Sequence, residues 1–490
     1  MTKKQALRLS TFLLLVVLMI SGLNWLLRDR ETTLSSLYSE PKNTVDVFMV
    51  GSSHVNSAYI PGVLWQDYDI SAHNVFSWSQ PMWISYHYII EGLRTQQPSV
   101  VVLDLNGMLY GNSAEAPEAT DQVNYLNSFS IAPGWNLLRM TKTVETCGID
   151  LRTATDFLPL IHYHTRWKTL DKHAFTYNPY NDPSYLKGYG FQVRIDPLTA
   201  PNYPATNERS APYETAVAYL DKIVALSEKE NFELIFVLAP YTYQQNELAI
   251  FNWLEDYSAE RGIPFYNYCT TDGDRIGIDW ATDFCDARHV NYLGALKLTH
   301  DLGSLLLQGE YDLRTRAELA NAAALDADAA KMERTIDLWT AIQNEPEDFI
   351  RWVNTTGGTL AIAASGDCTT LPDSVWQTLE ATGFDQISIL QQLGSSYAAV
   401  LERGMIQQTA DPSGSKIDCQ SSIAGLQVRS QGSITLGTEL IFEDTNYAAS
   451  SSGLHLLYYD TVLQRVVYHI TIDSTGNFVY TDVGSTDSST

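Results

Sequence analysis

The sequence has little positive charge. Its 490 residues contain 31 Lys and Arg against 57 Asp and Glu, which gives a formal net charge of −26. Such a surface repels a phosphate backbone, so the composition argues against a nucleic-acid partner. It also disfavours long-range attraction of anionic substrates, although a local Arg or Lys cluster could still hold one.

Cysteine is also scarce, with five residues: Cys147, Cys269, Cys285, Cys368 and Cys419. That is too few for a disulfide-rich scaffold, and no Cys or His spacing resembles a zinc site. Outside the membrane two pairings are open, Cys269 with Cys285 and Cys368 with Cys419, and neither is required. We expect no metal ion and no cofactor.

A long uncharged run occurs at the start of the chain. It extends over Leu9–Leu27, and basic residues precede it: Lys3, Lys4 and Arg8. At about 1.5 Å per residue the run can span a bilayer core, and the basic residues predict a cytoplasmic N-terminus. We therefore expect residues 1–30 to be the retained signal anchor of a single-pass cell-membrane protein, with a polar stalk over 31–44 and an extracytoplasmic body. A cleaved signal peptide is the alternative.

Short apolar runs and helical patterns alternate from residue 45 to residue 309. Strands are predicted at Val47–Val50, Asn74–Phe76, Ser99–Leu105, Leu234–Leu238 and Pro264–Tyr266. Helices are predicted at Trp83–Leu93, Ala216–Leu226, Glu247–Glu260 and Asn291–Leu307. This alternation predicts an α/β domain with a parallel sheet covered by helices on both faces. Residues 107–213 interrupt the rhythm and are interpreted as an insertion over the carboxyl ends of the strands.

The chain after residue 309 is organised differently. An Ala-rich, charged linker helix is expected over 310–335, and a smaller α/β domain over 336–483 that turns to β structure from Gly425. Residues 484–490 form a Ser, Thr and Asp tail, typical of disorder.

Gly51-Ser52-Ser53-His54 directly follows the first predicted strand. A nucleophilic serine needs a strand-end turn that exposes its hydroxyl and leaves backbone N–H groups free for an oxyanion. Gly51 permits such a turn. Alone the motif is weak, because Gly-Ser-Ser turns also occur in ordinary βα loops.

Asp286-Ala287-Arg288-His289 comes just before the last helix of the same domain. The Asp286 carboxylate can accept a hydrogen bond from Nδ1 of His289 and leave Nε2 free to take a proton from serine. An Asp-x-x-His at a helix start can also be simple capping. The two motifs together supply the groups of a serine nucleophile system in the order Ser, Asp, His.

On these two motifs, the first 310 residues resemble the SGNH (GDSL-like) hydrolase family, in particular its membrane-anchored branch near the D-alanyl-lipoteichoic acid and alginate O-acetylation proteins. The resemblance implies a flavodoxin-like three-layer α/β/α fold over 45–309, with residues 107–213 as a lid. It implies Ser53 as nucleophile, His289 as general base and Asp286 as its orienting partner.

In this family two further sequence blocks serve the oxyanion hole, and the corresponding segments of this chain match them less closely. The second block reads Asn74-Val-Phe-Ser77-Trp-Ser79-Gln80-Pro81 and has no Gly, so Ser77 or Ser79 would supply the backbone donor. The third reads Leu103-Asp104-Leu105-Asn106-Gly107. Asn106 is a candidate donor or a turn residue, since Asn-Gly is a common turn pair.

Four further residues are candidates for substrate binding. His164, Arg166 and Trp167 lie close together in the insertion, where Arg could hold an acidic group and Trp could stack on a sugar. The alternative is an amphipathic segment that packs Trp167 inward. His54 either lines the pocket or caps the helix after the nucleophile.

The C-terminal region weakly resembles the interleukin-like EMT inducer domain. The matching segments include Phe349-Ile350-Arg351, Gly358-Thr359-Leu360, Val428–Gly432 and Gly453-Leu454-His455-Leu456. A related domain in the stem of an O-mannose glycosyltransferase binds sugar, so the resemblance implies carbohydrate binding. The Gly-Leu strand follows the Phe-Ile helix here, in the reverse of the family's order, so no binding residue is carried over. A small structural module is the alternative.

Together these features predict a serine esterase or O-acyltransferase acting on acyl esters, acetyl above all, of a cell-surface glycan. Transfer would need an acyl donor, for which a membrane acyl-exporting protein is the expected partner. The alternative is a catalytically inactive glycan-binding or assembly protein on the same scaffold, favoured by the missing Gly of the second block. A lipase is disfavoured, because no extended apolar lid is evident over 107–213.

Overall fold

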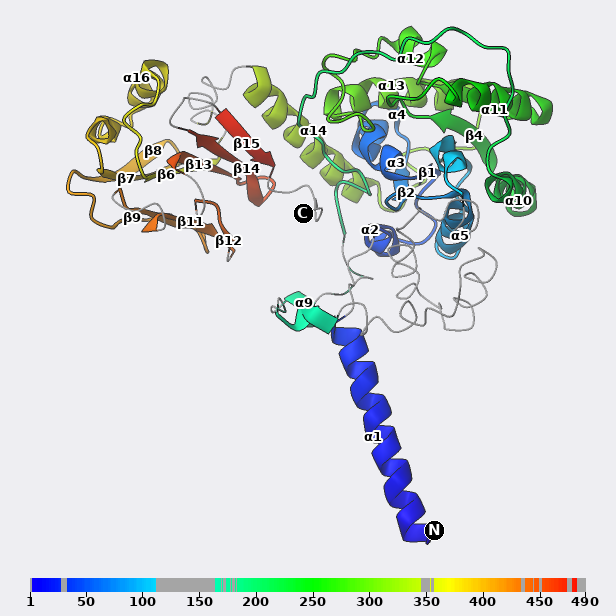
Figure 1. Cartoon of the computed structure of the whole chain (residues 1–490), viewed down its shortest axis with the longest axis horizontal. Coiled ribbons are helices and arrows are strands. Elements are labelled where there is room, and N and C mark those ends of the chain that lie inside the picture. The colour runs from blue at the N-terminus through cyan, green and yellow to red at the C-terminus, as the bar shows by residue number, and fades with distance from the viewer. Residues whose placement is uncertain are drawn as a thin grey trace. The chain divides into compact units, whose positions relative to one another are not determined.

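The computed structural model divides into two units, Met1–Met332 and Glu333–Thr490, each described by itself (Figure 1). The structure describes residues 2–27, 33–111, 164–168, 170, 173–176, 178, 181, 183–344, 353, 357–432, 437–443, 445–448, 452–473 and 478–482.

The first unit begins with a long apolar helix, α1 (Lys3–Leu27). Its 25 residues are long and apolar enough to cross a membrane, and the structure buries none of its most apolar stretch. The helix is compatible with a membrane anchor, and a signal sequence has the same properties.

A five-stranded parallel sheet forms the centre of the first unit. Its strands are β1 (Val47–Gly51), β2 (Ala72–Phe76), β3 (Val100–Asp104), β4 (Glu233–Leu238) and β5 (Phe265–Asn267). Their order is β2-β1-β3-β4-β5, and every pair is parallel. This is the flavodoxin-like doubly wound order, in which ligands bind at the carboxyl ends of the strands. The α/β expectation is confirmed at this level.

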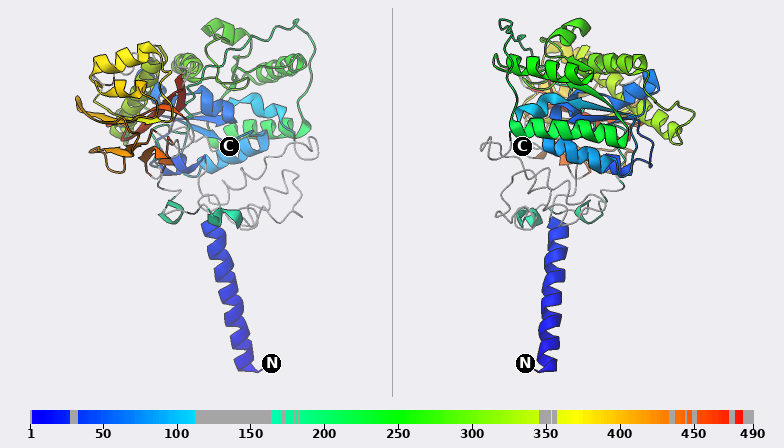
Figure 2. Two further views of the ribbon diagram at one scale, coloured as in Figure 1. Left: turned by 60° about the vertical axis from the view of Figure 1, so that its left-hand side comes forward. Right: turned by 90° about the vertical axis from the view of Figure 1, so that its right-hand side faces the viewer.

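Helices cover both faces of this sheet (Figure 2). On one face α5 (Met82–Gly92) packs with α10 (Glu214–Glu230), and on the other α13 (Tyr292–Gln308) packs with α3 (Ser53–Ala58) and α4 (Pro61–Tyr68). The remaining helices near the sheet are α11 (Glu247–Arg261) and α12 (Thr271–Ile276). The strands read as continuous apolar runs because both of their faces are buried.

The prediction of a polar stalk over residues 31–44 is wrong for the part that the structure describes. From residue 33 onward the segment folds into the domain and contains a short helix, α2 (Ser35–Ser39). Leu34 and Leu37 are fully buried in the core of the sheet domain. Their spacing of three places both on one helix face, and burial of two Leu side chains outweighs the polar character of their neighbours.

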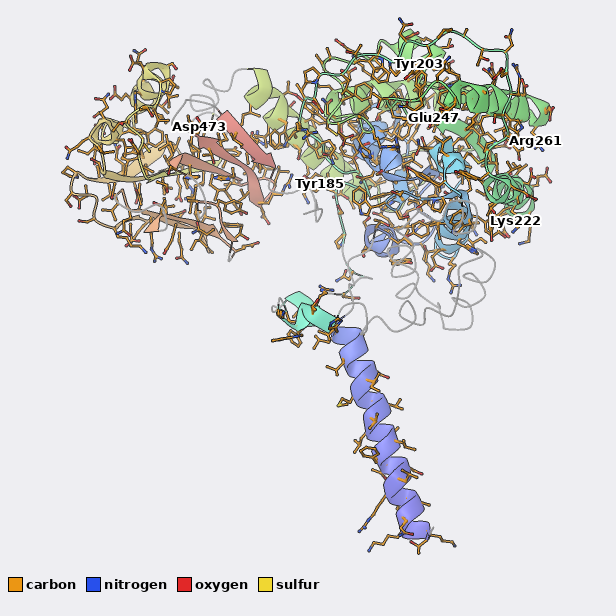
Figure 3. The ribbon with its side chains drawn as sticks, in the orientation of Figure 1. Tyr185, Tyr203, Lys222, Glu247, Arg261 and Asp473 are labelled. Carbon is orange, nitrogen blue, oxygen red and sulfur yellow. The ribbon has the colours of Figure 1, made fainter. Side chains whose placement is uncertain are left out.

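Residues 187–210, at the end of the predicted insertion, form an extended strap around the carboxyl edge of the sheet. Backbone hydrogen bonds join the strap to its neighbours. They connect Lys187 with Asn74 of β2, Gly190 with Asn56 of α3, Asp196 with Phe284 before Asp286, and Ser210 with Ala249 of α11. Tyr203 in the strap packs on Tyr243, and Figure 3 labels it together with Glu247 at the start of α11. Residues 112–163, most of the expected lid, lie outside the described residues.

Helix α14 (Ala322–Asn344) joins the two units within the chain. Its first half packs with Trp65 through Leu325 and Ala329. Farther along, Arg334 forms an ion pair of 2.8 Å with the buried Asp460 of the second unit. The linker helix was expected to begin at residue 310, and α14 begins 12 residues later, at Ala322.

The second unit is built on antiparallel sheets. Its larger sheet has the order β15-β14-β13-β6-β7-β8, and its smaller sheet the order β12-β11-β10-β9. The strands are β6 (Thr359–Ser365), β7 (Ser396–Glu402), β8 (Met405–Asp411), β9 (Ile417–Cys419), β10 (Gln427–Ser430), β11 (Glu439–Phe442), β12 (Thr445–Asn446), β13 (Gly453–Asp460), β14 (Arg465–Ile472) and β15 (Phe478–Asp482). The helices α16 (Asp373–Thr382) and η4 (Ile387–Gln391) precede β7.

The four cysteines that the structure describes are buried thiols outside any disulfide: Cys269, Cys285, Cys368 and Cys419. Neither candidate disulfide forms. Cys269 instead donates to the carbonyl of Ala239, and Cys285 to that of His289. Burial raises the pKa of the Cys269 thiol well above its ordinary value, so this thiol is a weak nucleophile.

Candidate functional site

Ser53 stands at the first residue of α3, two positions after β1 ends. Ser52 caps the helix, its hydroxyl oxygen accepting the backbone N–H of His54 at 3.4 Å. Gly51 is required at the strand end, because a Cβ there would lie 2.6 Å from Val55 and 2.8 Å from Asp104. The turn therefore presents the Ser53 hydroxyl at the carboxyl edge of the sheet.

His289 and Asp286 reach this hydroxyl from the other end of the domain. Nε2 of His289 lies 2.8 Å from Oγ of Ser53, and Nδ1 lies 2.9 Å from Oδ2 of Asp286. The structure thus brings the three predicted residues into one continuous chain of hydrogen bonds. A serine, an imidazole and a carboxylate in this arrangement can transfer a proton from the hydroxyl to the imidazole.

The Asp286 carboxylate is held as an anion. Burial raises its pKa, but the hydrogen bond and charge of His289 and two backbone N–H groups outweigh that effect and bring the pKa to about 2. The two N–H donors are those of Arg288 at 2.7 Å and His289 at 2.9 Å. The carboxylate is therefore fixed in orientation before any substrate arrives.

The segment that carries these two residues is itself anchored. The N–H of Cys285 donates to the carbonyl of His289, and the N–H of Thr242, after β4, donates to that of Ala287. Asn291 then caps α13, its Oδ1 accepting the N–H groups of Leu293 and Gly294. The spacing of Asp286 and His289 is thus set by a turn pinned on both sides.

Asn106, just after β3, has a buried side-chain amide without a hydrogen-bond partner in the described part of the chain. It is 1% exposed, and neither Oδ1 nor Nδ2 forms a hydrogen bond within the described part of the chain. β3 pairs with β1, and Asn106 comes two residues after the end of β3 as Ser53 comes two residues after the end of β1. An unpaired buried amide lowers the stability of the folded protein by about 1–3 kcal/mol, and a ligand that bonds to the amide would remove this penalty.

Ser77 and Ser79 lie in the loop after β2. The Ser77 hydroxyl donates to Oε1 of Gln80 at 2.9 Å, and Nε2 of Gln80 donates to Ser85 at 3.0 Å. Ser79 takes a left-handed φ of 50°, the conformation that a glycine adopts without strain. Ser79 is therefore a strained residue in this loop, the Ser77 side chain is bonded to Gln80, and a backbone donor role for either residue stays a prediction.

Asp104 was not singled out by the sequence analysis, and it organises this edge. Its carboxylate accepts the N–H of Asn106 and the N–H of Ala239, each at 2.9 Å. Complete burial raises the pKa of Asp104 to about 7, against the two N–H groups that lower it. In the sequence, this role is indicated by an Asp at the end of a strongly apolar strand.

His54 lies beside His289 in the site. It is 2% exposed, and its ring centroid lies 5.2 Å from that of His289 and 5.6 Å from that of Tyr241. Burial lowers the pKa of His54 to about 3, and the charges of His289 and Arg288 act in the same direction. The imidazole is therefore neutral, and its Nδ1 lies 2.9 Å from the Ser52 hydroxyl.

The other predicted binding residues lie elsewhere in the first unit. His164, Arg166 and Trp167 form the short helix η3 (His164–Lys168), which packs with α1. Trp167 is 65% exposed, so it does not pack inward as the amphipathic alternative requires. The hydrogen bonds described for Ser53, Asp286 and His289 include none to η3.

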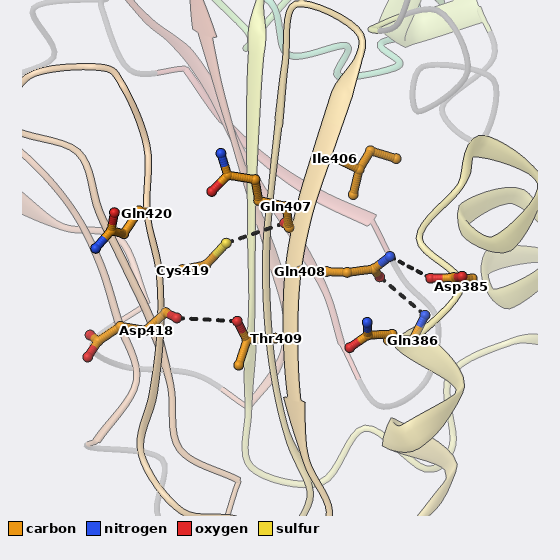
Figure 4. A pocket seen from close by; sticks show the side chains of 9 residues that line it. All are labelled: Asp385, Gln386, Ile406, Gln407, Gln408, Thr409, Asp418, Cys419 and Gln420. Atoms are coloured by element: carbon orange, nitrogen blue, oxygen red, sulfur yellow. Dashed lines mark hydrogen bonds between the residues drawn. The ribbon is translucent and has the colours of Figure 1, made fainter.

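The second unit has a polar groove at the β8 edge of its larger sheet, with a volume of about 560 Å³ (Figure 4). Side chains from three segments line it: Asp385, Gln386, Gln407, Gln408, Thr409 and Asp418. Gln408 is already bonded to Asp385 and to the N–H of Gln386. The Gln408 amide is therefore engaged within the groove's own wall.

Among the described residues no group of three or more His, Cys, Asp or Glu is arranged to hold a metal ion. In comparisons with known proteins, no family model matches this chain, and no curated protein matches it.

Proposed function

We propose that this protein is a membrane-anchored serine O-acyltransferase or esterase of the SGNH type, acting outside the cytoplasm on acyl esters of a cell-surface glycan. The observation that carries the proposal is the hydrogen-bonded chain Ser53–His289–Asp286, at the carboxyl edge of a parallel sheet. Its geometry suits nucleophilic acyl transfer.

In the first half-reaction His289 takes the proton of Ser53 as Oγ attacks the ester carbonyl. The new C–O bond gives a tetrahedral oxyanion, which Nδ2 of Asn106 stabilises from its buried, otherwise unpartnered position. Collapse breaks the ester C–O bond. The imidazolium returns its proton to the leaving alkoxide, and the acyl group stays on Ser53.

In the second half-reaction the acceptor attacks the acyl-enzyme. His289 removes a proton from the acceptor oxygen and gives it back to Oγ of Ser53 when the acyl bond breaks. Water as acceptor makes the protein an esterase, and a sugar hydroxyl makes it a transferase. Asp286 stays ionised and fixes the imidazole throughout both steps.

Turnover of 4-nitrophenyl acetate by the soluble body tests this proposal. The expected result is release of 4-nitrophenol that Ser53→Ala abolishes and Ser52→Ala reduces only in part, because Ser52 is a cap and not the nucleophile. Absence of Ser53-dependent turnover would leave a catalytically inactive glycan-binding protein. Adding an acylated donor and a glycan acceptor then separates hydrolysis from transfer.

A further inference from the structure

His54 and Tyr241 bring two buried, unpartnered polar atoms to one side of the catalytic histidine. Tyr241 follows β4 and is 2% exposed. Its hydroxyl and Nε2 of His54 form no hydrogen bond within the described part of the chain. Burial raises the pKa of Tyr241 far above its ordinary value, so the phenol keeps its proton.

The tautomer of the neutral His54 is coupled to the direction of its hydrogen bond with Ser52. The Ser52 hydroxyl oxygen accepts a hydrogen bond from the backbone N–H of His54. The same oxygen lies 2.9 Å from Nδ1 of the His54 ring, so the hydroxyl proton can be donated to Nδ1. If the Ser52 hydroxyl donates to Nδ1, the ring proton is on Nε2. His54 then holds a free donor at Nε2, and its ring contacts that of Tyr241 edge-on, with 5.6 Å between the ring centroids.

Of these two residues, His54 is the one whose ring contacts His289. In a serine acyl-transfer site the base exchanges a proton with the alcohol oxygen, either as leaving group or as acceptor. The ring of His54 lies 5.2 Å from that of His289, centroid to centroid, so the two imidazoles are neighbours in the site. Asn106, two residues after β3, is assigned to the carbonyl oxygen in the proposed mechanism, so a different pair of groups would have to bind the alcohol part of the ester.

We propose that His54 and Tyr241 form a subsite for a second hydroxyl, on the carbon next to the reacting oxygen, so that the alcohol part of the substrate is a vicinal diol such as a sugar ring carries. This inference rests on the proposed function and specifies its substrate. A second hydroxyl accepts from Nε2–H of His54 and exchanges a hydrogen bond with the Tyr241 hydroxyl. Both atoms then recover the hydrogen bonds they lack in the free protein.

Two matched esters test this subsite, cis-2-hydroxycyclohexyl acetate and cyclohexyl acetate, which differ only in the neighbouring hydroxyl. The expected kcat/KM of the protein is roughly tenfold higher for the hydroxyl ester. Tyr241→Phe keeps the ring and its packing on His54, and it should reduce that ratio several-fold. Tyr243→Phe, on the same loop with its ring 5.4 Å from that of Phe251, is the control and should keep the wild-type ratio.

The outcomes separate the two claims. A ratio near one in the wild-type protein, or a ratio that Tyr241→Phe leaves unchanged, overturns the diol subsite while Ser53-dependent turnover of 4-nitrophenyl acetate still supports the proposed function. No Ser53-dependent turnover of any of the three esters overturns the proposed function and the subsite with it. His54→Gln gives a second variant, for which the same fall in the ratio is expected.

Discussion

The imidazole of His289 lies 2.8 Å from the hydroxyl of Ser53, although 236 positions separate the two residues in the chain. One stands at the start of the helix after the first strand, and the other just before the last helix of the sheet domain. The parallel order of the strands brings the first turn and the last turn to the same edge. The experiments below follow from that contact and from the groups that hold it.

Asp286→Asn should lower kcat by about 10³–10⁴-fold, because an amide cannot hold the tautomer of His289 that accepts the serine proton. The fold should be preserved, since residue 286 is at the surface and keeps its size. Steady-state kinetics with 4-nitrophenyl acetate, beside circular dichroism, checks both points. An activity close to that of the wild type would show that Asp286 does not act on His289.

Asn106→Ala should lower kcat by about 10²–10³-fold with little change in KM, because the amide acts on the oxyanion and not on the bound ester. The free energy of unfolding should stay constant or rise, since the buried amide has no hydrogen bond to lose. Urea unfolding and kinetics on one preparation test this combination. A destabilised variant with normal kcat would identify Asn106 as a structural turn residue.

Asp104 should make the protein less stable as the pH rises from about 4 to about 7. Its folded pKa of about 7 is above its ordinary value of 3.8, so its contribution is complete below about pH 4 and is lost between there and about pH 7. The loss amounts to at most roughly 4 kcal/mol. Urea unfolding from pH 4 to pH 8 measures it, and Asp104→Asn should flatten that dependence while weakening one of the two N–H contacts.

Gly51→Ala should destabilise the protein by about 1–3 kcal/mol and lower kcat, because the new methyl group overlaps Val55 and Asp104 and displaces the nucleophile turn. Gly262→Ala is the control for a glycine substitution in open space. Gly262 has a left-handed φ of 66° and no neighbour within 4 Å, so that variant should lose stability but keep kcat. Equal kcat in the two variants would contradict a tight turn at Gly51.

The strands and the three residues of the site could be predicted because each depends on local pattern. Val47–Val50 and Ser99–Leu105 are apolar runs that both faces of a sheet must bury, and the structure has β1 and β3 there. The order Ser, Asp, His within one α/β domain then indicated which turns meet. The catalytic role of these residues stays a prediction.

The rest depended on tertiary contacts that no spacing records. Tyr241 reaches His54 because the loop after β4 turns back and bonds to Ala287, which no pattern around residue 241 indicates. Leu34 and Leu37 are two apolar residues in a polar segment, and only the core that receives them shows that this is not a stalk. The second unit's antiparallel sheets depend on pairings between distant strands, which periodicity does not specify.

Labelling with a fluorophosphonate probe tests the central claim most directly. The probe forms a bond only with an activated serine, so mass spectrometry of the labelled protein should place a single adduct on Ser53. His289→Ala and Ser53→Ala should both lose the adduct, and Ser52→Ala should retain it. Failure of the wild-type protein to react, or an adduct on another serine, would contradict the account.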